Sequence, residues 1–466
     1  MVKENIAYSG MASFLAVGVA AALAAFAGAQ ETEEKEPGLR VATFDMDVTP
    51  PVGAPMAYDP VETKWDLGLR GRGIVLMGAG DPIVLCAMDW IGIANGAYDA
   101  FQQALAEAAN TTPERVAVHS VHQHDAPRSD FTTERVLEEA GLEPNIFGGD
   151  FQRDVIERLA QRVAASLESA QPVTHIGIGK ANVEQVASNR RILGEDGKVR
   201  AVRFTACRDP KLRAEPEGTI DPELSMVSFW NGDNPVAVLT YYATHPQSYY
   251  RTGAPNPDFP GVARFLRELE VPQALHVHFT GAAGNIGAGK YNDGSKENRG
   301  ILARRMLDAM RRAWDNTERQ PIQPGDVHWR ITKTALPLAP HLKVEELEAM
   351  LENKPEEANL MRVARNLAWA RRCEAGHGID VSCLEIGPAQ LVHMPGELFV
   401  EYQLAAKQMR PDKLVAMAAY GDYAPGYICT TVAYDQGGYE ASENASRVAP
   451  EVEPVLMAAI QEVLKP

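Results

Sequence analysis

Two pairs of short apolar segments constrain the fold of this 466-residue chain more than any other pattern. Segments 73–77 and 82–89 are separated by Gly-Ala-Gly-Asp, and segments 383–386 and 390–392 are separated by a Gly-Pro turn. Apolar runs of this length around Gly- and Pro-containing turns are typical of antiparallel β-hairpins. Because a regular TIM barrel of parallel strands and helices contains no such pairs, the hairpins argue against that architecture.

Helical patterns are interleaved with strand patterns along the rest of the chain. Apolar residues recur every three or four positions in segments 98–109, 151–170, 296–314 and 452–464, as on one face of an α-helix. The interleaving predicts an α/β fold, with α+β as the alternative, in which mixed β-sheets are flanked by helices. We expect residues 41–466 to form a single domain, although the length alone would allow two or three.

The first 40 residues do not share this pattern. A polar start is followed by an Ala-rich apolar run at residues 11–26 and by Ala-Gly-Ala ending at Ala29, which fits the small-residue rule for signal cleavage. We therefore predict a signal peptide at residues 1–29, export to the periplasm or out of the cell, and a disordered linker at residues 30–40. An uncleaved membrane anchor is the alternative, because the apolar run is near the lower length limit for a span.

The formal net charge of −17 argues against nucleic acid as a partner, because an acidic surface and a phosphate backbone repel each other. The five cysteines are odd in number and widely spaced, and they contain no Cys-x-x-Cys pair. Disulfides are therefore not expected to form the scaffold of the protein.

Histidines follow or interrupt strand-like segments at several points. His122 and His124 come directly after the apolar run 116–120, and the alternation of a continuing strand would place both side chains on one face. Neutral imidazole is a common zinc ligand, so this pair is a candidate for a metal or catalytic site, and two ordinary histidines at a strand end are the alternative. A second pair, His276 and His278, has the same spacing inside a predicted strand.

His245 and Glu397 also lie where apolar segments end. His245 follows the run 235–242, and Glu397 precedes a predicted helix at 398–408. Functional residues of open α/β sheets collect at strand ends. Together with His122 they supply two histidines and a carboxylate, a common ligand set for catalytic zinc that leaves one position for water or substrate. No local motif such as His-Glu-x-x-His holds this set together.

Eight short motifs resemble, in their order along the chain, those of one enzyme family. Between about residues 41 and 446 the chain resembles the catalytic domain of the neutral ceramidases, the zinc-dependent amidases that cleave the N-acyl bond of ceramide. Each motif is weak alone, and their common order makes the resemblance specific. They are Asp47-Val48-Thr49-Pro50-Pro51, Val121-His122-Gln123-His124-Asp125-Ala126-Pro127, Asn189-Arg190, Ala243-Thr244-His245-Pro246, Gly281-Ala282-Ala283-Gly284, Met394-Pro395-Gly396-Glu397, Tyr427-Ile428-Cys429-Thr430-Thr431, and Tyr434 with Tyr439-Glu440-Ala441-Ser442.

The resemblance implies a single catalytic domain of ceramidase-like fold and a Zn²⁺ ion as cofactor. The implied zinc ligands are His122, His245, Glu397 and Tyr434, and Tyr439 is the second candidate for the tyrosine ligand. A tyrosine ligand is chemically reasonable, because a bound dication lowers the pKa of the groups that coordinate it.

The resemblance also implies roles for the residues around the metal. His124 would be the acid/base group, and its position beside His122 agrees with that role independently. Arg190 would contact the oxyanion or the amide oxygen, and Asn189 and Tyr439 would contact the substrate. The implied activity is hydrolysis of a linear amide in a small-molecule or lipid N-acyl substrate, and a lipid substrate would bring a peripheral contact with a membrane.

The chain departs from the family at three points. The family's Ser-x-Asp-x-x-Gly segment, whose serine has been assigned a catalytic role, matches residues 256–261, where Asn256 and Pro257 stand and no serine is present. A further family tyrosine has no counterpart near Asn444, and the C-terminal immunoglobulin-like domain has no counterpart either. These differences leave two alternatives open: an exported binding or scaffold protein with the same fold, and a metal enzyme of the amidohydrolase type on a TIM barrel.

Overall fold

The computed structural model describes residues 38–64, 67–356 and 359–465. The predicted signal peptide at residues 1–29 lies outside these ranges, as does the predicted linker up to residue 37. Strand β1 (Arg40–Asp47) begins one residue before the predicted domain boundary. Among the described residues, no helix is long and apolar enough to cross a membrane.

The first sheet contains the predicted N-terminal hairpin. Its strand order is β5-β3-β2-β1-β7, in which β2 and β3 pair antiparallel and β3 and β5 pair parallel. Every side chain of β3 and β5 is buried, which explains why these strands read as continuous apolar runs and not as an alternating pattern. The remaining strands of this sheet are β2 (Arg70–Met77), β3 (Ile83–Met88), β5 (Val116–Ser120) and β7 (Gln171–Pro172).

The second sheet has the order β14-β13-β12-β8-β16, and the third has the order β17-β18-β19-β21. Each combines antiparallel pairs with one parallel pair, β13 with β14 and β19 with β21. Antiparallel pairing of β18 with β19 confirms the predicted C-terminal hairpin. The strands are β8 (His175–Asn182), β12 (Glu223–Asn231), β13 (Asn234–Tyr242), β14 (Leu275–Thr280), β16 (Glu318–Pro321), β17 (Val327–Thr334), β18 (Ile379–Ile386), β19 (Ala389–His393) and β21 (Leu414–Ala418).

Four two-stranded pairs lie in the loops that connect these sheets. They are β4 (Gly92–Ile93) with β6 (Arg128–Ser129), β9 (Ser188–Asn189) with β15 (Ile286–Gly287), β10 (Arg191–Leu193) with β11 (Val199–Val202), and β20 (Glu397–Leu398) with β22 (Tyr427–Ile428).

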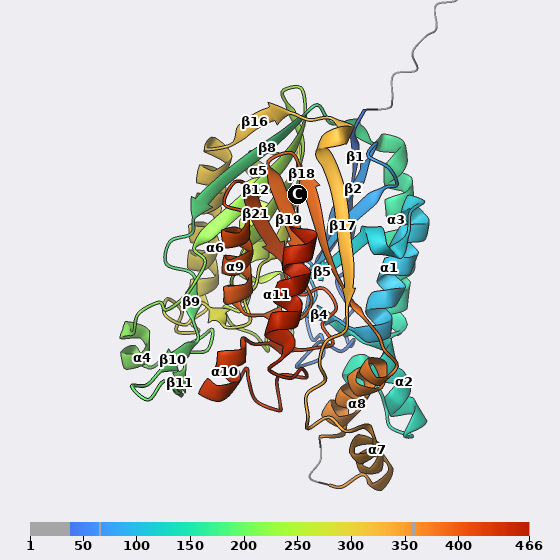
Figure 1. Ribbon diagram of the computed structural model, residues 1–466, viewed down its shortest axis with the longest axis vertical. Coiled ribbons are helices and arrows are strands. Elements are labelled where there is room, and N and C mark those ends of the chain that lie inside the picture. Colours follow the sequence, from blue (N-terminus) through green and yellow to red (C-terminus); the bar gives the residue numbers. More distant parts are fainter. Residues whose placement is uncertain (1–37, 65–66, 357–358, 466) are drawn as a thin grey trace, which may run out of the picture. The chain divides into compact units, whose positions relative to one another are not determined.

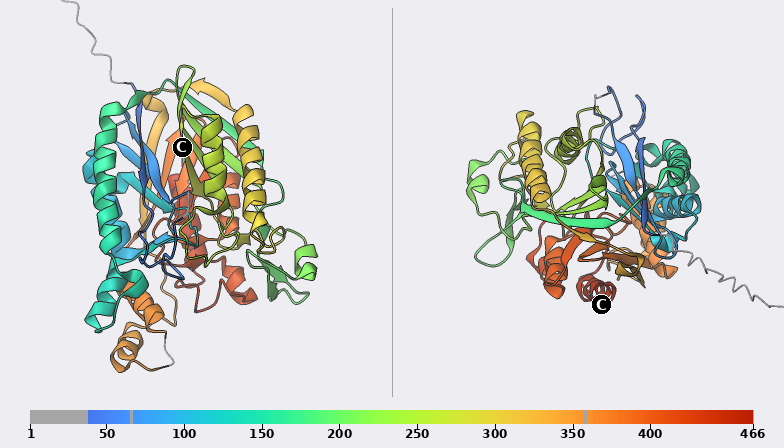
Figure 2. Two further views of the ribbon diagram at one scale, coloured as in Figure 1. Left: turned by 180° about the vertical axis from the view of Figure 1, so that it is seen from behind. Right: turned by 90° about the horizontal axis from the view of Figure 1, so that it is seen from above.

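The three large sheets share one apolar interior, and helices cover their outer sides (Figures 1 and 2). Helices α1 and α3 pack on the first sheet, α5 and α6 on the second, and α9 and α11 on the third. The helices are α1 (Asn95–Ala109), α2 (Phe131–Glu139), α3 (Asp150–Ser166), α4 (Pro210–Ala214), α5 (Asp258–Glu270), α6 (Glu297–Asp315), α7 (Val344–Asn353), α8 (Leu360–Glu374), α9 (Val400–Met409), α10 (Thr431–Gln436) and α11 (Val452–Val463).

Mixed sheets flanked by helices confirm the predicted α/β class. The open sheets with antiparallel pairs also exclude the TIM barrel that the amidohydrolase alternative requires.

The three sheets are joined where β5, β14 and β21 end. The backbone N–H of Ser120 donates to Tyr420 O at 2.9 Å, and that of Ala419 donates to Thr280 O at 2.9 Å. The Thr280 hydroxyl donates to Val121 O at 2.7 Å. These bonds hold one strand end from each sheet against the others, and the segments that follow β5 and β21 and the neighbouring strands β13 and β19 carry the candidate site.

Candidate active site

Three histidines and one glutamate from distant parts of the chain meet in the interior. One ring nitrogen from each of His122, His124 and His245 lies within 4.8 Å of the others, and all three residues are buried. The Nε2 atoms of His122 and His245 lie 3.4 and 3.2 Å from Glu397 Oε2. The structure therefore brings together three of the four ligands that the resemblance implies, in a group that could hold a metal ion.

Backbone carbonyls fix the orientation of two of these histidines. His122 Nδ1 lies 2.5 Å from Ile91 O, and His245 Nδ1 lies 2.7 Å from Ala283 O. Because a carbonyl oxygen only accepts, each Nδ1 must carry the hydrogen, which leaves a lone pair on Nε2. Metal-binding histidines are commonly held in this way, with one ring nitrogen donating to the protein and the other facing the ion.

His124 has the opposite arrangement. The Gln247 side-chain amide donates to His124 Nδ1 at 2.9 Å, and the Thr205 hydroxyl donates to Gln247 Oε1 at 2.5 Å. The hydrogen of neutral His124 therefore sits on Nε2, which is buried and has no hydrogen-bond partner among the described residues. Burial holds the pKa of His124 well below its ordinary value, and the nearby His122 and His245 lower it further.

The His122–His124 pair does not lie on a continuing strand as predicted, although the two rings do converge. Strand β5 ends at Ser120, and His122 has a φ of 77°, in the left-handed region that costs a non-glycine residue about 1–3 kcal/mol. The ring centroids of the pair nevertheless lie 5.0 Å apart. A turn, and not strand alternation, aims both imidazoles into the same space.

Glu397 is held as a carboxylate. Burial alone would raise its pKa, but His122 and His245, when they carry a proton on Nε2 in place of a metal ion, keep the pKa well below the ordinary value. The Tyr423 hydroxyl donates to its other oxygen, Oε1, at 2.5 Å. Tyr423 lies in the aromatic, Gly-rich loop that follows β21 and matches no motif, so sequence reasoning missed it.

Arg190 lies beside this group. Its guanidinium is 3.2 Å from Glu440 Oε1 and donates to the Tyr427 hydroxyl at 3.3 Å. Burial would lower the pKa of Arg190, but Tyr427 and Glu440 raise it above the ordinary value, so the side chain is a fixed cation. Arg190, the three histidines and Glu397 line one cavity of about 290 Å³.

Much of the remaining wall of this cavity is aromatic. Its aromatic residues are Tyr58, Phe204, Tyr250, Tyr423, Tyr427 and Tyr439. Tyr58 stacks on His124 with ring centroids 5.6 Å apart. The structure thus places Tyr439, the second candidate for the tyrosine ligand, at the cavity.

Tyr434, the first candidate for that ligand, does not line the cavity. It lies in the short helix α10, where its hydroxyl is 3.0 Å from Ser446 Oγ and donates to Val448 O at 3.2 Å. The hydroxyl of Tyr434 is therefore engaged outside the cavity, and the structure does not bring this residue to the histidines as expected.

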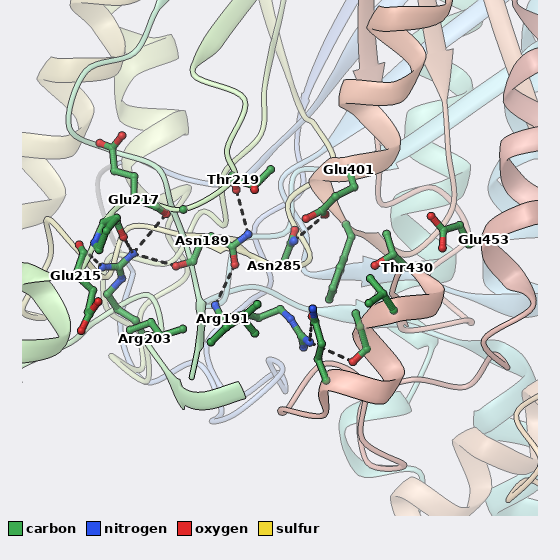
Figure 3. A pocket seen from close by; sticks show the side chains of 18 residues that line it. Asn189, Arg191, Arg203, Glu215, Glu217, Thr219, Asn285, Glu401, Thr430 and Glu453 are labelled. Atoms are coloured by element: carbon green, nitrogen blue, oxygen red, sulfur yellow. Dashed lines mark hydrogen bonds between the residues drawn. The ribbon is translucent and has the colours of Figure 1, made fainter. Parts of the chain in front are cut away.

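Asn189, the other implied substrate contact, also faces elsewhere. Its side chain donates to Thr219 O at 3.0 Å and accepts from the backbone N–H of Arg191 at 3.0 Å, in a separate cavity of about 610 Å³ (Figure 3). Asn189 is the last residue of β9 and directly precedes Arg190, so it affects the histidine cavity only through the backbone that positions Arg190. The predicted contact of Asn189 with a substrate in the histidine cavity is therefore not supported.

Solved structures share this architecture. Neutral ceramidase from Pseudomonas aeruginosa matches with a TM-score of 0.64 over 91% of this chain and 74% of that chain, at 17% sequence identity. A ceramidase complexed with C2 matches over the same shares with the same TM-score, at 16% identity. This is the neutral ceramidase fold. No family model matches the chain, and no curated protein does so.

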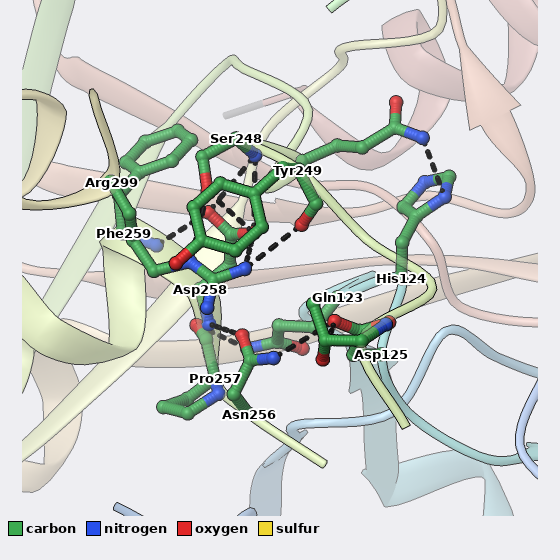
Figure 4. A network of polar contacts seen from close by, with 12 residues as sticks. Gln123, His124, Asp125, Ser248, Tyr249, Asn256, Pro257, Asp258, Phe259 and Arg299 are labelled. Atoms are coloured by element: carbon green, nitrogen blue, oxygen red, sulfur yellow. Dashed lines mark hydrogen bonds and ion pairs between the residues drawn. The ribbon is translucent and has the colours of Figure 1, made fainter. Parts of the chain in front are cut away.

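The neutral ceramidase fold is thus confirmed as the fold that the motifs predict. Asn256 stands where the family's serine is expected. Asn256 is buried and donates to Asp125 Oδ2 at 3.0 Å, while its oxygen accepts from the backbone N–H of Asp258 at 3.1 Å (Figure 4). It does not line the histidine cavity, so in this chain the position ties the start of α5 to the segment that carries His124.

The second His-X-His pair has a structural environment. His278 lies in β14, where its Nδ1 is 3.0 Å from the Thr240 hydroxyl, and burial lowers its pKa to about 3. His276 is also buried, and burial lowers its pKa to about 4. Neither side chain lines the cavity of His122.

Proposed function

We propose that the protein is an exported, zinc-dependent amidase of the ceramidase type, which hydrolyses an N-acyl amide bond. The observation that carries the proposal is the convergence of two histidine Nε2 lone pairs on one oxygen of Glu397, next to a histidine of the opposite tautomer. Similarity to ceramidase structures supports the same reaction class.

The residues present fit a zinc ion. His122 Nε2 is buried without a hydrogen-bond partner among the described residues, a costly state for a lone pair unless something binds it. His122, His245 and Glu397 would hold the ion, and Tyr439 lines the same cavity. Bound zinc would supply a Lewis acid that activates water and polarises the amide carbonyl.

The remaining groups are placed for the other needs of amide hydrolysis. Gln247 holds His124 with its hydrogen on Nε2, which can donate a hydrogen bond to the amide, while the proton that the leaving amine takes comes from the attacking water. Arg190 is a fixed cation at the cavity wall and would stabilise negative charge that develops on the amide oxygen. Glu440 and Tyr427 keep that guanidinium in place, so no reorganisation is needed during the reaction.

Metal analysis of the purified protein, combined with a screen of N-acyl substrates, tests the proposal. We expect one zinc per chain and release of free amine. His122→Ala should lose both zinc and turnover, whereas His124→Ala should keep zinc and lose most turnover, because only the first residue offers a lone pair to the ion. Protein free of metal would overturn the assignment.

Zinc binding without turnover on any amide would instead support the binding-protein alternative. That alternative rests on the absence of the family's serine, which is replaced by Asn256. Because Asn256 does not line the cavity, its presence removes no group from the wall, and this favours the enzyme over the binding protein.

A further inference from the structure

Three arginines besides Arg190 line the histidine cavity. Arg128 lies in β6, Arg365 in α8, and Arg447 in the segment between α10 and α11. Arg190 forms an ion pair with Glu440, but none of the other three forms an ion pair with a carboxylate anywhere in the described part of the chain. The cavity therefore contains more positive charge than its own walls compensate.

Two of these guanidinium groups have hardly any polar contact. Arg365 makes no side-chain hydrogen bond to any described residue, and its Nε is buried and unpartnered. Arg128 Nε is in the same state, and the guanidinium carbon lies 5.6 Å from the ring centre of Phe147. Buried donors of charged groups are normally satisfied, because leaving them unpaired costs free energy.

Arg447 is 3% exposed, and its two hydrogen bonds are to neutral acceptors. It donates to Asn366 Oδ1 at 3.0 Å and to Ala424 O at 2.8 Å. Burial lowers the pKa of Arg447 to about 9, and the charges of Arg365 and Arg128 contribute to this. Three like charges thus face one small space.

Nearby carboxylates are occupied elsewhere. Asp130 accepts from Asn95 and from Thr133 at the N-terminus of α2, and Glu397 faces the two histidines. An anion from outside would neutralise the arginines without disturbing either carboxylate. Carboxylate and phosphate groups are the partners that arginine binds most strongly, through paired hydrogen bonds.

The other lining residues favour a small polar ligand. Ala445 is the only aliphatic side chain among the lining residues that the structure describes, and the volume of about 290 Å³ is at the low end for small-molecule sites. A long acyl chain would gain little from this wall, since its binding depends on apolar burial. The acyl chain would instead lie against the four lining aromatic side chains that are exposed, Tyr58, Phe204, Tyr250 and Tyr439.

We infer that the substrate is an N-acylated amine that carries an oxyanion, a carboxylate or a phosphate ester, and that Arg365, Arg128 and Arg447 bind this group beside the scissile amide. The inference rests on the proposed amidase function. Water adds across the amide: the C–N bond breaks, hydroxide joins the acyl carbon, and the amine takes the proton. The products are a carboxylate and an amine that bears the anionic group.

Three substrates with one acyl chain test the inference: N-octanoylglycine, N-octanoyl-O-phosphoethanolamine and the neutral N-octanoylethanolamine. We expect kcat/KM for at least one anionic substrate to exceed that for the neutral one by about tenfold or more, and the preferred anion identifies the oxyanion. Arg365→Met should lower this ratio by about tenfold, mainly through KM. Arg371→Met is the matched control on the same helix, because Arg371 is exposed and pairs with Glu348, and it should leave the ratio unchanged.

Binding measurements separate this inference from the proposed function. Octanesulfonylglycine and octanesulfonylethanolamine carry an uncleavable sulfonamide, so calorimetry reports anion recognition without turnover. Tighter binding of the glycine compound to the wild type, lost in Arg365→Met, supports the inference even if no amide is cleaved.

Cleavage of the neutral substrate with no preference for an anion, and with no effect of Arg365→Met, would overturn the inference and leave the amidase intact. If Arg365→Met does not fold, Arg128→Met provides the same comparison, because its guanidinium also lacks an ion pair among the described residues.

Discussion

A buried ion pair behind the histidine segment gives a sharp prediction for Asp89→Asn. Asp89 and Arg264 are almost fully buried, with Arg264 Nη1 at 2.9 Å from Oδ1 and Nη2 at 2.6 Å from Oδ2. The carboxylate also accepts from the backbone N–H of Arg70 at 2.9 Å and from the Gln123 amide at 3.0 Å. Each of its oxygens therefore faces two donors.

An asparagine amide cannot reproduce this arrangement, because its NH₂ group would face two donors on whichever side it points. It would also leave Arg264 charged and buried without a counterion. Breaking a buried pair from one side typically costs about 3–5 kcal/mol in the free energy of unfolding. Because Gln123 lies between His122 and His124, the loss of its anchor should also lower turnover.

Urea unfolding of Asp89→Asn, Arg264→Met and the double variant provides the assay. The double variant should lose clearly less than the sum of the two single losses, because it contains no unpaired cation. Strict additivity of the two losses, or a loss below about 1 kcal/mol for Asp89→Asn, would refute the reasoning.

Two further predictions follow from the tyrosine loop and from a buried carboxyl group. Tyr439→Phe should lower zinc affinity or turnover, whereas Tyr434→Phe should leave both close to the wild type. Zinc titration and amine release measure the two effects. The reverse pattern would identify Tyr434 as the ligand. Burial raises the pKa of Asp422 to about 7 from an unfolded value near 3.9, so its neutral form is favoured in the fold. The contribution of Asp422 to the free energy of unfolding is complete below about pH 4 and is lost as the pH rises through about 7. The loss is about 4 kcal/mol at most. Urea unfolding between pH 5 and 8 should show this decline in the wild type and a flatter one in Asp422→Asn. An equally steep decline in the variant would contradict the assignment to Asp422.

The hairpins were predictable because their information is local. Each consists of two apolar runs and a turn, and each is present in the structure. The meeting of His122, His245 and Glu397 was predictable from the resemblance of the motifs to one family, because no local motif joins these residues. His122 and His245 follow β5 and β13, whereas Glu397 begins β20.

The choice of Tyr434 as a ligand and the failure to single out the cavity arginines also have physical causes. Tyr434 and Tyr439 lie five residues apart in one loop, and only the short helix α10 decides which of them faces the cavity. Arg128, Arg365 and Arg447 each resemble an ordinary solvated charge in the sequence. Their convergence depends on how three separate elements pack, and neither periodicity nor spacing encodes that packing.

The hydrogen bonds that join β5, β14 and β21 have a consequence for how the protein matures. Because the walls of the cavity come from loops attached to all three sheets, no sheet alone can form the histidine cluster. High metal affinity should therefore appear only in the last step of folding, after the sheets have docked. Uptake of the proposed zinc ion would then report completed assembly, and the bound ion would slow the separation of the sheets.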